Sequence, residues 1–211
     1  MIKLESLAGT EALTQMERLE TTPQKKKLII GIPKENTFQE NRIALVPNTV
    51  NLLVNSGHKV IIQSDAGKNA RFFNNHYSEQ GAQIVDTIEE VFKADIILKV
   101  SPLSLEELKL LSNKQVIIST LHATIQKEEY FRLLSAKKVT ALAFEYIKDK
   151  TNTFVVVRSM SEIAGNTSIL IAAEYLININ NGKGLMLGGF SGITPTEVVI
   201  LGAGTVGEFA A

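Results

Sequence analysis

The sequence contains no cysteine, which excludes disulfide bridges, a thiolate nucleophile and a cysteine-based zinc site. Only three histidines occur, scattered along the chain, so we expect no metal site. The chain also lacks net charge, because 22 basic residues balance 22 acidic ones, and no basic run of useful length is present. We therefore expect no nucleic-acid partner.

Long hydrophobic runs are missing as well. No stretch approaches the roughly 20 apolar residues that a membrane span needs. The N-terminal residues are charged and lack the uninterrupted apolar core of a signal peptide. What the chain does have is 211 residues, 45% of them hydrophobic, which is enough for one or two globular domains with a sizeable core. We expect a cytoplasmic protein.

Short apolar runs alternate with amphipathic segments from residue 28 onward. Runs typical of buried strands lie at 28–32, 59–63, 95–100, 115–119 and 139–143. Helical patterns lie between them at 47–55, 87–93, 104–110 and 126–136. This alternation predicts an α/β fold, a Rossmann-like or flavodoxin-like parallel sheet with helices on both faces.

The pattern of residue types changes near both ends of the sequence, and these changes predict four regions. They are a helical N-terminal extension at 1–27, a first domain at 28–159, a connecting helix with a glycine-rich linker at 160–195, and the start of a second Rossmann domain at 196–211. The connecting helix begins with MSEIAG, and Ser161 is its candidate N-cap. The apolar run 198–201 is expected to form the first strand of the second domain.

Three glycines, Gly202, Gly204 and Gly207, form a G-x-G-x-x-G pattern after that apolar run and before a helix-compatible segment. In this setting the pattern indicates a dinucleotide-binding turn, with phosphates at a helix N-terminus. The alternative is a glycine-rich turn without a ligand. Only four residues follow Gly207, whereas the ribose-binding acid of such units comes about 20 residues further on. We therefore expect a fragment of a longer protein, with an incomplete nucleotide-binding unit.

Polar side chains at predicted strand ends are candidates for a second site. Arg42 follows the first strand and is suited to bind a carboxylate, although a surface arginine is the alternative. His122 follows the fourth and is suited to act as a general acid, although a core histidine is the alternative. Because parallel strands end at one edge, we expect Arg42, His122 and Ser101 to share one rim.

The remaining charged or titratable candidates have structural interpretations. Lys99 and Glu145 also lie at strand ends, and a buried charge there requires a partner. His58 lies in a helix-to-strand turn and His76 in a polar segment, so both are expected to be structural or solvated.

The order of these motifs resembles that of the alanine dehydrogenase and nicotinamide nucleotide transhydrogenase family. The motifs are GIPKE, NRIALVP, SGHKVIIQSDAGKNA, ILKVSP, TLHA, FEYI, MSEIAG and LMLGGFSGITPTEVVILGAGTVG, from about Leu28 to the last residue. The resemblance implies a catalytic domain joined by helices to an NAD-binding domain, with substrate and nicotinamide in the cleft between them.

The same resemblance implies roles for individual residues. Arg42 occupies the position of the family's substrate-carboxylate arginine and His122 that of its catalytic histidine, while Glu145 matches an acidic residue of the family. Met160 and Ser161 match the start of the connecting helix near the nicotinamide, and the glycine pattern at 202–207 matches the NAD turn.

One position departs from the family pattern. Alanine dehydrogenases typically carry K-V-K-E-P after the third strand, and the second lysine binds substrate, whereas this chain reads Lys99, Val100, Ser101, Pro102. Ser101 cannot supply a cation there.

The resemblance therefore implies an NAD-dependent oxidoreductase that converts L-alanine to pyruvate and ammonia in its full-length form, with this fragment alone inactive. An amino acid or 2-oxo acid is the expected small-molecule partner, and a homo-oligomer the expected assembly. One alternative is the nucleotide-binding part of a transhydrogenase α-subunit, which needs a membrane partner. Another is a catalytically inactive regulatory relative.

Overall fold

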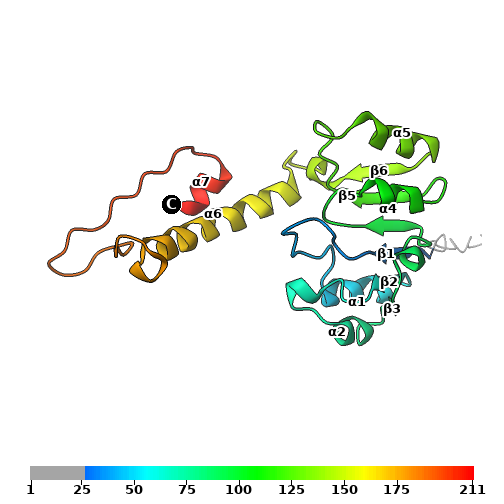
Figure 1. Ribbon diagram of the computed structural model, residues 1–211, viewed down its shortest axis with the longest axis horizontal. Helices are drawn as coiled ribbons and strands as arrows, with labels where there is room; N and C mark the ends of the chain where they lie inside the picture. Colours follow the sequence, from blue (N-terminus) through cyan, green and yellow to red (C-terminus); the bar gives the residue numbers. More distant parts are fainter. Residues whose placement is uncertain (1–26) are drawn as a thin grey trace, which may run out of the picture.

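The computed structural model describes residues 27–211, so the helical extension expected at 1–27 falls outside the described residues except for its last position. The sheet domain lies at one end of the molecule (Figure 1). A single long helix, α6 (Val155–Leu176), projects from it, and the short helix α7 (Thr205–Ala210) lies against α6.

Six parallel strands form one sheet in the order β3-β2-β1-β4-β5-β6. The strands are β1 (Ile29–Ile32), β2 (Lys59–Gln63), β3 (Gln83–Val85), β4 (Ile96–Leu98), β5 (Val116–Ser119) and β6 (Thr140–Ala143). In the middle of the sheet Ile30 pairs with Val60 on one side and with Ile96 on the other. This is the Rossmann order, in which the direction of winding reverses between β1 and β4. The predicted fold class is confirmed.

Helices cover the two faces of the sheet. They are α1 (Pro47–Asn55), α2 (Asn74–Ser78), α3 (Ile88–Val91), α4 (Leu105–Leu110) and α5 (Glu128–Ala136), with single 3₁₀ turns at η1 (Lys68–Ala70), η2 (Phe144–Tyr146) and η3 (Asn178–Asn180). One core joins the sheet to α1 and α2 through Val50 and Tyr77. The other joins it to α3, α4 and α5, with Leu108 and Tyr130 fully or almost fully buried.

The structure contains two elements that were not predicted, and one predicted helix begins earlier than expected. The strand β3 and the helix α2 were not predicted, because three and five residues are too few for a clear periodicity. The connecting helix begins at Val155 rather than Met160, so Ser161 is not its N-cap and donates instead to the Val157 carbonyl oxygen at 2.9 Å. Valine lowers helix propensity only slightly, so the valine run at the start of α6 is compatible with a helix.

The strand expected at 198–201 is not formed within the described residues. A strand exists only where a neighbouring strand accepts its backbone hydrogen bonds, and here the segment runs beside α6 without one. The run is apolar, as a buried strand requires, but an apolar composition does not supply a neighbouring strand.

The helix α6 carries the C-terminal segment. Gly165 is its one buried residue, and a Cβ added there would lie 2.6 Å from the Val206 carbonyl oxygen and 2.7 Å from the Phe209 Cβ. The absence of a side chain at Gly165 therefore lets α7 pack directly on α6. None of the helices in the described part of the chain is long and apolar enough to cross a membrane.

We predict that residues 28–147 fold without the rest of the chain. Every residue of the two cores lies between Ile29 and Ala141, so removing α6 and α7 removes no core side chain. The truncated protein should unfold in urea in one cooperative transition with a slope of at least about 1 kcal/mol/M. A broad, non-cooperative loss of circular dichroism would show that α6 is integral to the first core.

Candidate functional site

The carboxyl edge of the sheet gathers the residues singled out from the sequence. Since all six strands are parallel, the segments that follow β1, β4 and β5 leave the sheet at the same edge. Arg42 follows β1, Ser101 follows β4 and His122 follows β5. The reversal of winding between β1 and β4 makes this edge the place where open α/β sheets bind ligands.

Arg42 is held by Glu40, two residues before it. Its Nε donates to Glu40 Oε1 at 2.8 Å and its Nη2 donates to Glu40 Oε2 at 2.6 Å. This hydrogen bond holds the pKa of Glu40 below its ordinary value and raises the pKa of Arg42, so both groups are charged at neutral pH. The Arg42 side chain is 57% exposed, and its Nη1 lies 3.5 Å from the Met160 sulfur on α6.

Ser101 is buried, not open on the rim as expected. Only 4% of the residue is exposed, and its hydroxyl has no hydrogen-bond partner among the described residues. The cause is Glu35, whose carboxylate accepts the Val100 N–H at 2.6 Å and the Ser101 N–H at 3.2 Å. These two bonds fix the turn after β4 with the Ser101 side chain directed inward.

Lys99 is completely buried and fully paired. Its Nζ donates to both carboxylate oxygens of Glu107, each at 2.9 Å, and to Asn36 Oδ1 at 2.9 Å. An ammonium group has three N–H donors, so none remains for a ligand. The structural interpretation of Lys99 is correct, and Lys99 does not replace the missing substrate lysine.

His122 is exposed and held by its backbone. The Leu121 and His122 N–H groups both donate to Glu145 Oε1, at 2.9 and 3.0 Å. Burial raises the pKa of Glu145, but these donors and nearby His122 outweigh it, so the pKa lies below its ordinary value. His122 has a φ of 47°, in the left-handed region that few non-glycine residues adopt. The alternative of a core histidine is wrong.

The other two histidines have structural contacts, as expected. His58 Nδ1 accepts the Leu28 N–H at 3.3 Å, and His76 Nδ1 accepts the Phe73 N–H at 3.2 Å at the start of α2. In the described part of the chain, no group of three His, Cys, Asp or Glu residues is arranged to hold a metal ion.

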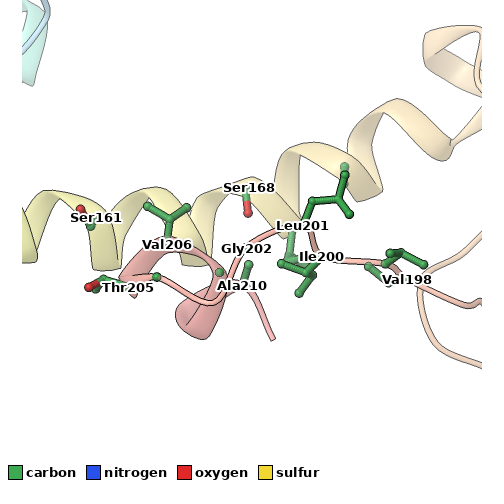
Figure 2. Close-up of a pocket in the computed structure, with 14 residues that line it drawn as sticks. Ser161, Ser168, Val198, Ile200, Leu201, Gly202, Thr205, Val206 and Ala210 are labelled. Atoms are coloured by element: carbon green, nitrogen blue, oxygen red, sulfur yellow. The ribbon is translucent and has the colours of Figure 1, made fainter.

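A hollow of about 620 Å³ lies between α6 and the segment 198–210 (Figure 2). Gly202 has a φ of 115°, which favours glycine, and a Cβ on Gly207 would overlap the Gly202 carbonyl oxygen. Gly204 is the N-cap of α7 and has open space where its Cβ would be. Ser161 and Thr205 line the hollow, whereas Met160 instead contacts Arg42. Glycine at 202 and 207 therefore lets the backbone turn tightly from the apolar run into α7.

Glu35, Glu40 and Glu107 were not singled out from the sequence. Their roles depend on contacts with residues that are 65, 2 and 8 positions away, and no periodic pattern marks such contacts. The one usable signal is the spacing of Glu40 and Arg42, because an acid two residues from an exposed arginine in a loop is within reach of it.

The comparisons with known proteins agree on one family. The model of the alanine dehydrogenase/PNT N-terminal domain matches residues 31–164, and that of the alanine dehydrogenase/PNT C-terminal domain matches residues 168–211. Alanine dehydrogenase from Methanococcus maripaludis is 39% identical over 185 residues, which are 87% of this chain and 49% of the relative. The Bacillus subtilis alanine dehydrogenase is 35% identical, over 87% of this chain and 48% of the relative.

Two solved structures extend the comparison. An L-alanine dehydrogenase superposes with a TM-score of 0.81 at 35% identity, covering 87% of this chain and 50% of its own. A transhydrogenase from Sinorhizobium meliloti has a TM-score of 0.64 at 25% identity, covering 70% of this chain and 45% of its own. The chain spans about half the length of the curated relatives it matches.

The buried Lys99–Glu107 pair gives a prediction for stability. Lys99→Met leaves the Glu107 carboxylate buried without its cation, so it should lower the free energy of unfolding by about 3–5 kcal/mol. The double variant Lys99→Met/Glu107→Leu removes both charges and should recover most of that loss. Urea unfolding of the three proteins measures the effect, and a single variant as stable as the parent would contradict the pairing.

A second prediction concerns pH. Because the pKa of Glu145 is lower in the folded protein than its unfolded value of about 4.3, the unfolded state binds more protons in acid. The stability that ionised Glu145 contributes is therefore complete above the unfolded pKa and lost as pH falls through the folded pKa. The melting-temperature difference between the parent and Glu145→Gln should shrink from pH 6 to pH 3.

The exposed Glu197, which lies in neither a helix nor a strand, provides the control for this measurement. Glu197→Gln should have the same melting temperature as the parent across this pH range. A constant difference between Glu145→Gln and the parent would show that the Glu145 charge does not hold the loop.

Proposed function

Because the chain belongs to the alanine dehydrogenase/PNT family, we propose that it supplies the substrate-binding half of an NAD-dependent alanine dehydrogenase. The overall reaction converts L-alanine, NAD⁺ and water to pyruvate, ammonium, NADH and a proton. The observation that carries the proposal is Arg42, an exposed guanidinium fixed by Glu40 at the same edge of the sheet as His122.

Arg42 and His122 have different roles toward the substrate. Arg42 binds the carboxylate of alanine or pyruvate through the donors that Glu40 leaves free. His122 exchanges a proton with the amino nitrogen or carbonyl oxygen of the substrate, and Glu145 positions it through the backbone of its loop. The exposure of both side chains keeps them accessible to a small amino acid or 2-oxo acid.

The glycine turn at 202–207 is suited to hold NAD. The backbone at Gly204 is open to a pyrophosphate, and Ser161 and Thr205 offer hydroxyl groups to the same hollow. When bound, NAD supplies the hydride acceptor for the substrate carbon. We assign Met160 to the boundary between the substrate and cofactor sites, because it lies on the same helix as Ser161 and contacts Arg42.

A homo-oligomer in the cytoplasm is part of the proposal. Large apolar side chains on α6 are strongly exposed, with Leu170 at 70% and Tyr175 at 71%, and such a surface favours association.

A transhydrogenase is the second candidate function. It is favoured by the burial of Ser101 and the complete pairing of Lys99, which leave no lysine donor from the turn after β4 for a substrate. The likeness to a solved transhydrogenase supports it as well. The hypothesis of an inactive regulatory relative is supported by the same difference from the family pattern at Ser101.

The proposal is tested by steady-state kinetics on protein that includes a complete second domain. Arg42→Ala should raise the KM for alanine about 10- to 100-fold, because it removes a charge-assisted hydrogen bond to the carboxylate. His122→Ala should mainly lower kcat, by about 10²- to 10⁴-fold. Alanine-dependent formation of NADH provides the measurement.

Arg132→Ala, which removes an exposed arginine on α5, is the matched control and should leave both constants unchanged. Hydride exchange between two nicotinamide nucleotides, without any alanine-dependent NADH, would favour the transhydrogenase. Protein with neither activity would favour the regulatory relative.

A further inference from the structure

The Glu40 carboxylate accepts hydrogen bonds from both the side chain and the backbone of Arg42. Its side chain is only 12% exposed, whereas that of Arg42 is 57% exposed. Both of its oxygens accept hydrogen bonds from Arg42, and Oε1 also accepts the Arg42 backbone N–H at 3.0 Å. Glu40 and Arg42 therefore form a bidentate pair, and the pairing determines which donors of the guanidinium remain free.

This geometry decides which edge of Arg42 is available. A guanidinium has five N–H donors, and Glu40 occupies the Nε and Nη2 edge. The remaining edge consists of Nη1 and the second N–H of Nη2, which also suits a bidentate carboxylate. Nη1 now faces the Met160 sulfur at 3.5 Å, and a thioether is a weak acceptor that a carboxylate displaces readily.

The charges around Arg42 limit what that edge can accept. Glu35 also acts electrostatically on Arg42, so the guanidinium lies in the field of two carboxylates. Lys99, which follows the neighbouring strand β4, has all three donors occupied by Glu107 and Asn36. One carboxylate of a ligand has a partner at Arg42, but a second carboxylate close by meets Glu40 and Glu35.

We propose that Glu40 is a positioning and specificity-determining residue, which presents one edge of Arg42 to monocarboxylates and disfavours dicarboxylates of similar size. The inference rests on the proposed function in one respect, namely that Arg42 binds the substrate carboxylate. It adds the residue that sets the preference between acids with one carboxylate and acids with two.

Binding to the 211-residue chain tests the inference without any need for turnover. Backbone amide signals in NMR spectra of ¹⁵N-labelled protein report the titrations of every variant, and the Arg42 Nε–H signal reports them as well wherever Arg42 is present. Propanoate and malonate are the probes, because both have three carbons and they differ by one carboxylate, and pyruvate is titrated alongside. The parent should bind propanoate more tightly than malonate.

Glu40→Gln keeps an acceptor for Arg42 but removes the negative charge. The malonate-to-propanoate affinity ratio should therefore rise about fivefold, which corresponds to roughly 1 kcal/mol for the loss of one unfavourable charge. Glu40→Asp keeps the charge and should retain the parent ratio, which a loss of folding would not produce. Glu106→Gln removes a charge from α4 and should change nothing.

The outcomes separate this inference from the proposed function. If Arg42→Ala weakens the binding of all three acids but Glu40→Gln leaves the ratio unchanged, the role of Glu40 is overturned and the carboxylate site stands. If none of the acids shifts the Arg42 signal in the parent, or if Arg42→Ala binds them equally well, the carboxylate site itself is overturned and the inference with it.

Discussion

Carboxylates that accept hydrogen bonds from consecutive backbone N–H groups hold the loops at the carboxyl edge of the sheet. Glu35, from the loop after β1, takes the N–H groups of Val100 and Ser101 beyond β4. Glu145, from the turn after β6, takes those of Leu121 and His122 beyond β5. Chains leaving parallel strands lose their ladder partners there, and a charged acceptor satisfies two donors at once. Each carboxylate therefore links the segments that follow two neighbouring strands, β1 with β4 and β6 with β5.

The chemistry of the site follows from that constraint. The Glu145 carboxylate keeps His122 in a left-handed conformation and exposed to solvent, while the Glu35 carboxylate turns Ser101 inward. Lys99, the cation nearest to Ser101 in the sequence, is paired with Glu107 and is therefore not available to a ligand. Arg42 thus remains an accessible cation on the loop after β1, paired with Glu40 through one edge of its guanidinium.

Most of the sheet could be predicted from the sequence because buried parallel strands are recorded as continuous apolar runs. The bounds of α1 at Pro47 and Asn55 were also predictable, since proline favours the first turn of a helix. The start of α6 was not, because its valine run has no cap residue to mark it. The carboxylate contacts and the burial of Ser101 depend on residues brought together only by folding, which local patterns do not encode.

The attachment of α6 has a mechanical consequence. The helix leaves the sheet domain after a short antiparallel bridge between Lys148 and Phe154, and the glycine turn with α7 is seated near Gly165, about 15 Å along its axis. At that radius a tilt of about 10° at the base carries the turn through roughly 3 Å. Arg42 meets α6 at Met160, about halfway from the base to Gly165, so a shift of the helix beside the guanidinium corresponds to a shift about twice as large at the glycine turn.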